Sequence, residues 1–308
     1  MKKNVDKGRQ TDLLIIGSIA FDDVKTPSGE VKDSLGGSAV YAAIAASKFT
    51  ASGIVGVVGD DFKQDTLSLL QDNQIDTRGV EFAKGETFHW SGVYNDLNKA
   101  ETLDTRLNVF ADFDPKIPVS YEEARYLFLG NIHPALQLKV LEQLKNAEII
   151  ACDTMNYWIN TTPDLLDQVV RKVNIIFINE DEIKSLTGLQ NVFDAGEKVL
   201  SMGPELVLIK RGEYGAVAMG RDFMFFAPVY PVRNVVDPTG AGDSFAGGFM
   251  GTIVKAGCIN EKVIKEAVIN GTITASFNIQ DFSFKLLLTA SQEEIEERKQ
   301  KLIKYMGM

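Results

Sequence analysis

The chain has 308 residues, of which 45% are hydrophobic and 24% charged, as is usual for a globular protein. Its formal net charge of −10 argues against a nucleic-acid or anionic-membrane partner, which would favour a basic face. No apolar run approaches the roughly 20 residues that a membrane-spanning helix needs, and residues 1–10 are polar, so a cytoplasmic location is expected. Cys152 and Cys258 lie far apart and predict neither a disulfide framework nor a zinc site.

Continuous apolar segments alternate with helical patterns along most of the chain. Segments of this kind are typical of parallel strands that are buried on both faces. They lie at 12–17, 54–59, 126–130, 149–153, 174–179 and 206–210. The alternation predicts an α/β fold with a Rossmann-like, doubly wound, mostly parallel sheet flanked by helices, in a single domain spanning 1–308.

Several helix starts are recognisable between these segments. Ser120 and Ser291 each precede a glutamate by three residues, which is the spacing of a capping box. Thr162 stands before a proline that suits a first helical turn. The charged residues 292–301 are expected to form the solvated face of a last helix.

The pattern changes between about residues 79 and 113. Segments 87–94 and 105–110 alternate polar and apolar residues and are separated by 95–101, which indicates a half-exposed hairpin. Together with residues 19–34, this region is predicted to form a small β-sheet lid over the main domain.

The seventeen residues 235–251 combine a turn, a glycine loop and a helix start. Asp237 and its following proline are typical turn residues, and 240–242 have almost no side chain. From Asp243 onward, apolar residues recur at helical spacing, so a helix is expected to begin near Gly242. A glycine loop at a helix N-terminus is a ready anion site. A carboxylate beside it suits phosphoryl transfer to a hydroxyl, although the same residues could simply start and pack a helix.

Residues 237–248, D-P-T-G-A-G-D-S-F-A-G-G, resemble the second signature of the ribokinase family, the phosphofructokinase-B-type carbohydrate and nucleoside kinases. The resemblance covers essentially the whole chain, because the family's other elements occur in family order. It implies a ribokinase-like fold and an ATP-dependent kinase. In such a kinase Asp243 would take the proton of the acceptor hydroxyl, and the N–H groups of Gly240, Ala241 and Gly242 would hold the charge on the transferred phosphoryl.

The nucleotide side of the predicted site follows from the same resemblance. Asn179 and Glu182 form an N-x-x-E element, which implies that Glu182 orients Mg²⁺ through water. Residues 212–215 resemble the family's G-x-x-G loop against the ATP phosphates. The predicted cofactor-binding residues are Asn179, Glu182, Lys210, Gly212, Gly215 and Thr239. Asp237 and Thr239 occupy positions at which many family members hold K⁺, but the second half of such a site is not evident in 275–282.

The acceptor side is less determined. Gly36 and Gly37 resemble the first family signature, and either Asp22 or Asp23, with a preference for Asp22, stands where the family has an aspartate that binds substrate hydroxyls. The predicted acceptor-binding residues are Asp22, Gly36, Gly37, Ser38 and Asp153. Two departures from the family pattern, Tyr41 in place of asparagine and the lack of an arginine in residues 153–158, leave a sugar, a sugar phosphate or a nucleoside open as the acceptor. The main interpretation is a carbohydrate kinase that phosphorylates a small sugar, and a nucleoside kinase of the same fold is the alternative.

Other readings were weighed against the kinase. A binding sensor would not need Asp243, an NAD-dependent oxidoreductase lacks G-x-G-x-x-G after its first strand, and no P-loop motif is present. A homodimer through lid strands is implied by resemblance. Aromatic side chains that could stack on an acceptor are more often core residues; they are Trp90, Tyr94, Phe110, Tyr157 and Trp158. His89 and His133 have no second ligand at metal-binding spacing, so both are expected to be structural.

Overall fold

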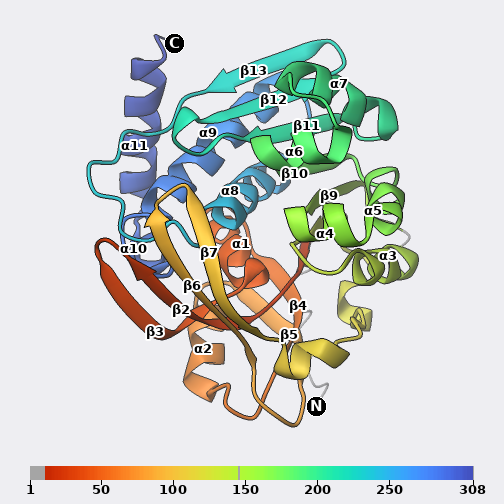
Figure 1. The fold of residues 1–308 in the computed structure, drawn as a ribbon, viewed down its shortest axis with the longest axis vertical. Helices are drawn as coiled ribbons and strands as arrows, with labels where there is room; N and C mark the ends of the chain where they lie inside the picture. Colours follow the sequence, from red (N-terminus) through yellow and green to blue (C-terminus); the bar gives the residue numbers. More distant parts are fainter. Residues whose placement is uncertain (1–10, 145, 308) are drawn as a thin grey trace, which may run out of the picture.

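The computed structural model describes residues 11–144 and 146–307, and a large sheet runs through their centre (Figure 1). Its strand order is β13-β12-β11-β10-β9-β8-β1-β4-β5. The strands are β1 Leu13–Ile16, β4 Ser52–Val58, β5 Ile75–Phe82, β8 Tyr126–Leu129, β9 Ile149–Asp153, β10 Ile175–Asn179, β11 Leu206–Lys210, β12 Ala216–Gly220 and β13 Phe223–Ala227. All neighbours pair in parallel except β11–β12 and β12–β13. The prediction of a mostly parallel, doubly wound sheet is confirmed.

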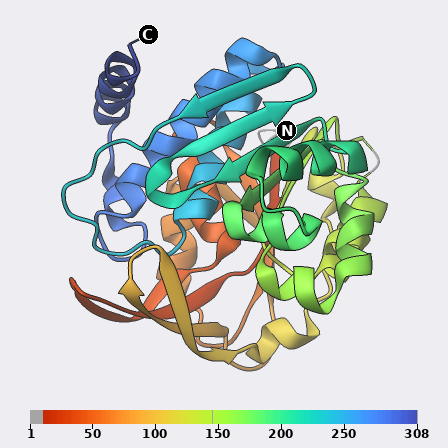
Figure 2. The same cartoon turned by 45° about the horizontal axis from the view of Figure 1, so that its top comes forward.

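Helices cover both faces of this sheet (Figures 1 and 2). One face packs α1 Ser38–Ala46, α2 Gln64–Asp72, α8 Ala241–Ala256, α9 Glu261–Asn278, α10 Lys285–Thr289 and α11 Gln292–Tyr305. The other packs α3 Pro134–Gln143, α4 Asn156–Thr161, α5 Pro163–Val170, α6 Glu180–Thr187 and α7 Val192–Met202. Leu13 and Ile15 join the first core cluster and Leu14 and Ile16 the second. The central strands β1, β8, β10 and β11 are therefore almost entirely apolar, because both of their faces are buried.

A second sheet of four strands, in the order β3-β2-β6-β7, lies beside the main domain (Figure 2). Its strands are β2 Ala20–Thr26, β3 Gly29–Gly36, β6 Phe88–Asp96 and β7 Lys99–Arg106. Two sequence boundaries were wrong. Residues 79–82 belong to β5 of the large sheet, and 108–112 form the 3-10 helix η1, Asn108–Asp112, instead of continuing a strand. The hairpin turns at 97–98, so the loop is shorter than the expected 95–101. Residues 99–101 belong to β7, whose polar and solvated pattern resembles that of a loop.

Two of the three predicted helix starts are confirmed. Ser291 and Glu294 form a reciprocal capping box on α11, and the proline after Thr162 lies in the first turn of α5. Ser120 instead lies in the short 3-10 helix η2, Val119–Tyr121, because β8 begins five residues later and leaves no room for a helix.

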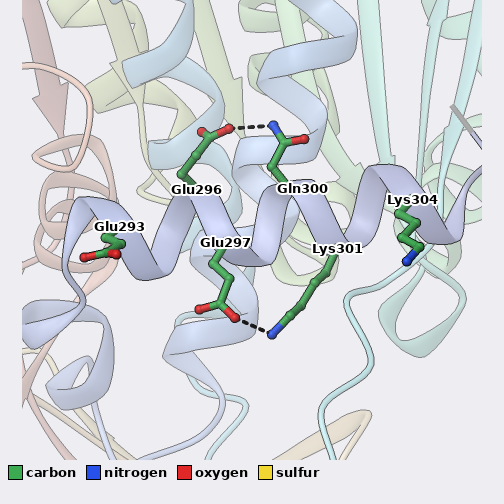
Figure 3. Close-up of a pocket in the computed structure, with 6 residues that line it drawn as sticks. All are labelled: Glu293, Glu296, Glu297, Gln300, Lys301 and Lys304. Carbon is green, nitrogen blue, oxygen red and sulfur yellow. Dashed lines mark hydrogen bonds and ion pairs between the residues drawn. The ribbon is translucent and has the colours of Figure 1, made fainter.

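The predicted solvated face of the last helix is also confirmed. Figure 3 shows that side chains on this face bond along α11 itself, Lys301 to Glu297 and Gln300 to Glu296, each at 2.6 Å. The residues that line the shallow depression between them all belong to α11. In the described residues no helix is long and apolar enough to cross a membrane.

Candidate active site

The sheet topology places the site. From β1 the chain first builds outward through β4 to β5 and then resumes on the other side of β1 with β8. Ligands of open parallel sheets bind beyond the carboxyl ends of strands near such a switch point. Asp153, Asn179 and Lys210 are the last residues of β9, β10 and β11, and Asn179 pairs in register with Lys210. Three predicted site residues are therefore brought to one edge of the sheet.

The glycine loop 240–242, predicted to be an anion cradle, lies at the N-terminus of α8. Gly240 caps the helix at φ 72°, and a Cβ there would come within 2.3 Å of the Tyr41 ring, so glycine is required both for its backbone and for its lack of a side chain. Ala241 N–H already donates to Pro238 O at 3.2 Å. Within the described residues, the N–H groups of Gly240 and Gly242 have no such acceptor, so these two are the free donors of the cradle.

Asp243 lies in the first turn of α8, half-buried, among charges from the strand ends. Burial, and after it the nearby Asp153 carboxylate, raises the pKa of Asp243 to about 7, while Lys210 opposes the shift. Lys210 Nζ donates to both oxygens of Asp153, at 2.9 and 2.7 Å. Burial lowers the pKa of Lys210, but the carboxylates of Asp153, Glu182 and Asp243 outweigh this and raise it. Asp243 is thus tuned toward neutral pH beside a fixed positive charge.

The N-x-x-E element begins α6. Asn179 Oδ1 accepts from Glu182 N–H and Glu182 Oε2 accepts from Asn179 N–H, both at 2.8 Å, which is a complete capping box. Glu182 is buried, and this burial raises its pKa to about 7 against the pull of Lys210. One carboxylate oxygen caps the helix, and the second is the group that could hold a hydrated divalent cation.

The predicted phosphate loop is a hairpin between β11 and β12 that contains the 3-10 helix η3, Gly212–Tyr214. Gly212 and Gly215 have φ values of 54° and 89°, and a Cβ on Gly215 would lie 2.0 Å from Ala227 O. Arg211, which follows β11, is engaged elsewhere, because its Nε lies 2.7 Å from Glu180 Oε2. Of the two neighbouring cations Lys210 and Arg211, it is therefore Lys210 that faces the cradle, since a Cβ on Gly242 would lie 3.2 Å from its Nζ.

The geometry distinguishes Asp22 from Asp23 on the acceptor side. Asp22 is 3% exposed, and burial, followed by the charges of Asp237, Asp243 and Asp23, raises its pKa to about 8. A Cβ on Gly36 would lie 1.9 Å from Asp22 Oδ2, so this glycine makes room for the carboxylate. Asp23 points to the other face of the strand, where its Oδ1 accepts from Asp33 N–H at 2.8 Å.

The remaining residues of the first signature are occupied by the chain itself. A Cβ on Gly37 would lie 2.4 Å from Ser18 O, and the Gly37 φ of 94° also favours glycine. Ser38 Oγ accepts from Ser18 N–H at 3.1 Å and lies 3.3 Å from Ser18 Oγ. These contacts dock α1 on the segment after β1, so a contact of Ser38 with an acceptor stays a prediction.

Asp237 holds the turn before the cradle. It is fully buried, and its two oxygens accept from Thr239 N–H at 2.9 Å and Ser283 N–H at 3.1 Å. Val236 N–H donates to Ile279 O at 2.8 Å. The loop 279–283 is thus the partner of this turn, although it contains no glycine and its sequence carried no recognisable signal.

Two further contacts around the site come from the lid and were not predicted from the sequence. Tyr94 of β6 places its hydroxyl 3.2 Å from Thr239 Oγ1, which connects the small sheet to the cradle. At the hairpin tip, Asn98 Oδ1 would lie 3.0 Å from a Cβ on Gly212, so the tip also reaches the phosphate loop. The contact with Thr239 shows that the Tyr94 face of the lid is turned toward the cradle.

Comparisons with known proteins identify the family of the chain. The model of the pfkB family carbohydrate kinases matches residues 10–288. The chain belongs to this family. A cytidine kinase from Thermococcus kodakarensis is 33% identical over 246 residues, which cover 78% of this chain and 87% of that protein. A fructokinase-1 from Oryza sativa is 26% identical, covering 87% of this chain and 93% of that protein.

Solved structures show the fold of this family member. The nucleoside kinase of Methanocaldococcus jannaschii superposes with a TM-score of 0.75 at 19% identity, covering 96% of this chain and all of that one. A Burkholderia thailandensis nucleoside kinase in complex with inosine gives a TM-score of 0.78 at 19% identity, covering 95% and 99%. The fold is ribokinase-like, and the protein is a kinase whose relatives include both carbohydrate and nucleoside kinases.

Proposed function

We propose that this kinase transfers the γ-phosphate of ATP to a hydroxyl group on the sugar of a ribonucleoside. The main support for this proposal is the position of Asp243, whose pKa lies near 7. It stands beside Lys210 in the first turn of α8, the helix that Gly240 caps. Asp243 takes the proton from the acceptor hydroxyl, the acceptor oxygen bonds to the γ-phosphorus, and ADP leaves. A group whose pKa lies near the working pH suits this proton transfer.

The charge on the transferred phosphoryl is met by the N–H groups of Gly240 and Gly242 and by the positive end of the α8 dipole. Lys210 contributes a cation at the same place, held by Asp153 until a phosphate competes for it. The free oxygen of Glu182 would hold Mg²⁺, which supplies charge neutralisation on the nucleotide phosphates. Since phosphoryl transfer depends mainly on positioning and electrostatics, these contacts account for most of the acceleration.

The test is ADP release with Mg-ATP and a panel of nucleosides, pentoses, hexoses and sugar phosphates. Asp243→Asn should lose at least about 10²-fold in kcat while retaining ATP affinity in a binding assay. Asp222→Asn, an exposed carboxylate outside the site, is the control. Turnover of Asp243→Asn at the wild-type rate would refute the mechanism. ATP binding without turnover on any acceptor would favour the alternative of a nucleotide or sugar sensor.

The nucleoside is preferred to a free sugar because of Trp90. Trp90 is the register partner of Asp22 and therefore shares its face of the lid, which Tyr94 orients toward the cradle. Its half-exposed indole lies over Gly92, where a Cβ would be 2.3 Å from the ring. An indole beside the hydroxyl-binding carboxylate offers a base a surface to stack on, typically worth about 1–3 kcal/mol. The named cytidine kinase makes cytidine the first acceptor to test.

Free ribose provides the matched comparison. Trp90→Leu should raise KM for cytidine by about tenfold or more, as the loss of stacking implies, and leave KM for ribose nearly unchanged. Two results would favour a carbohydrate acceptor instead, as the fructokinase relative would suggest. One is an equal effect of Trp90→Leu on KM for cytidine and KM for ribose, and the other is a wild-type enzyme that turns over ribose or fructose in preference to any nucleoside.

Two further assignments belong to the same proposal. K⁺ would bind beside Asp237 and loop 279–283, and comparing kinetics in K⁺ with kinetics in Na⁺ would test this.

A homodimer would form through the lid, whose edge strand β7 is exposed at all eight residues. Light scattering of the wild type and of Leu103→Lys on β7 measures this, and a monomeric wild type would contradict it.

A further inference from the structure

The lid face opposite to Asp22 carries three side chains that could bind a metal ion. They are Asp23 of β2, Asp33 of β3 and His89 of β6, and one ligand atom from each lies within 4.8 Å of the others. Side chains alternate along β2, so Asp23 lies on the opposite face to Asp22. His89 is the register partner of Phe21 and therefore lies on the same face as Asp23. The cluster is thus separate from the active site.

The separations between these atoms are those of metal ligands. His89 Nε2 lies 3.4 Å from Asp23 Oδ1 and 3.5 Å from Asp33 Oδ1. An imidazolium hydrogen-bonded to a carboxylate would be closer, at about 2.7–2.9 Å. Nitrogen and oxygen ligands at about 2.0–2.2 Å from a tetrahedral zinc ion are about 3.4 Å apart. The two observed distances match the edges of such a tetrahedron.

The local backbone directs both carboxylates to this point. The register pairs Asp22 with Ser34 but Val24 with Val31, so β3 has an extra residue opposite Asp23. A bulge of this kind re-aims a side chain. Asp33 adopts φ 49° there, and its N–H donates to Asp23 Oδ1 at 2.8 Å. The two aspartates are held beside one another despite their like charges.

Burial of the histidine provides an independent reason for a ligand. The His89 side chain is only 9% exposed, and its Nε2 faces Asp23 and Asp33 yet makes only the two long contacts with them. A buried polar group without a normal partner is costly. A ligand at Nε2 would supply one, and Asp33, which is 81% exposed, leaves the point open to solvent.

We propose that Asp23, Asp33 and His89 form a binding site for one divalent transition-metal ion of the zinc class, with water completing its coordination. Imidazole together with carboxylates suits Zn²⁺, whereas Mg²⁺ favours oxygen ligands. The ion joins β2, β3 and β6, three of the four lid strands. It stabilises the lid on the face behind the acceptor-binding aspartate and takes no part in the reaction.

The test uses the full-length chain, stripped with a chelator and titrated with Zn²⁺ by calorimetry in excess Mg²⁺. One equivalent should bind, and His89→Gln and Asp33→Asn should each weaken binding by at least about tenfold. Asparagine tolerates the positive φ of Asp33 and the residue is exposed, so this variant preserves the fold. Asp104→Asn, on neighbouring β7, and Glu182→Gln, at the proposed Mg²⁺ site, should bind Zn²⁺ as the wild type does.

Two further readouts do not depend on activity. Co²⁺ should give the visible absorption of a tetrahedral site in the wild type and not in Asp33→Asn, and Zn²⁺ should raise Tm in the wild type and in the two controls but not in His89→Gln or Asp33→Asn. Absence of saturable Zn²⁺ binding would show that the three residues form only an ion pair and would overturn the proposal. Binding that survives both ligand substitutions, or that disappears in Glu182→Gln, would overturn it as well.

Discussion

Gly36 and Asp22 show how one residue depends on the absence of a side chain in another. Asp22 has a buried carboxylate, and the space beside it exists because Gly36 has no Cβ. In the structure, Gly36 accommodates Asp22 and Gly37 accommodates the Ser18 carbonyl. Under the proposed function, the acceptor would therefore meet a carboxylate whose position Gly36 sets.

Gly36→Ala should consequently impair acceptor binding. The new methyl group would meet Asp22 Oδ2 at 1.9 Å and displace the carboxylate. We expect KM for the acceptor to rise by at least about tenfold, equivalent to about 1.4 kcal/mol, while ATP affinity is kept. Gly220→Ala, whose Cβ would make an ordinary 3.4 Å contact in β12, is the control. An unchanged acceptor KM in Gly36→Ala would contradict the role given to Asp22.

The pH dependence of turnover tests Asp243. Burial raises its pKa to about 7, and only the carboxylate accepts a proton. We expect kcat/KM for the acceptor to fall as pH decreases below about 7, approaching tenfold per pH unit, because a growing fraction of Asp243 is protonated. Initial rates between pH 5 and 8.5 measure this, with a coupling assay checked at each pH. A profile that is flat down to pH 5 would exclude Asp243 as the base.

At the scale of elements, the first turn of α6 combines a structural and a functional role in one side chain. Glu182 caps the helix with Oε2, and α11 has the same capping box with Glu294. Glutamine can keep the cap through its amide oxygen but loses the charge. Glu182→Gln should therefore change Tm little and raise the Mg²⁺ concentration needed for half-maximal activity by about tenfold.

Glu294→Gln is the matched control. It alters the same motif on α11, which packs on the opposite face of the sheet from α6, and should leave the Mg²⁺ requirement unchanged. If Glu182→Gln and Glu294→Gln gave the same Mg²⁺ dependence as the wild type, Glu182 would be a capping residue only.

The lid hairpin is the second element with a testable role. Thr239 Oγ1 donates to the Tyr94 hydroxyl at 3.2 Å, and burial raises the pKa of Tyr94 to about 12, so the phenol stays protonated. Tyr94→Phe removes one hydrogen bond between lid and cradle, typically worth about 1 kcal/mol. We expect the product of the KM values for ATP and for the acceptor to rise about fivefold. Tyr305→Phe, exposed at the end of α11, is the control, and identical kinetics in both variants would contradict a closing role for Tyr94.

For the whole molecule, the active-site carboxyls make stability depend on pH. Asp22, Asp243 and Glu182 all have pKa values raised by burial, to about 8, 7 and 7. The native state therefore holds protons that the unfolded chain has released above about pH 4–5. Their contribution to stability is complete below that range and is lost as pH rises through 7 to 8, at up to about 1.4 kcal/mol per pH unit for each group.

Urea unfolding of the ligand-free protein at pH 5 and pH 8 measures this effect. The free energy of unfolding should be lower at pH 8, and Asp22→Asn should remove part of the difference. Equal stability at both pH values in the wild type would show that the carboxyls are solvated in solution. A full difference in Asp22→Asn would assign the dependence to other groups.

The elements that were predicted well share a strong local cause. The parallel strands were visible because Ile175–Ile178 and their counterparts are apolar on both faces, and the α8 start was visible because glycines precede a helical pattern. The lid boundaries were wrong where that cause is weak: β7 is entirely solvated, and residues 108–112 have strand-like composition but fold as a 3-10 helix under β6. Capping of Ser120 failed because the next strand follows too soon.

By itself, the sequence determined the fold class and the start of α8 at its glycine loop, with Asp243 in the first turn, because glycine loops, helix starts and buried strands follow from short-range physics. Only the tertiary structure chose Asp22 over Asp23, paired Lys210 with Asp153, and supplied loop 279–283 to Asp237. It also brought His89 to Asp23 and Asp33, although the sequence predicted a structural histidine. These contacts join residues 10 to 66 positions apart along the chain, and only the packing of sheets brings such distant side chains together.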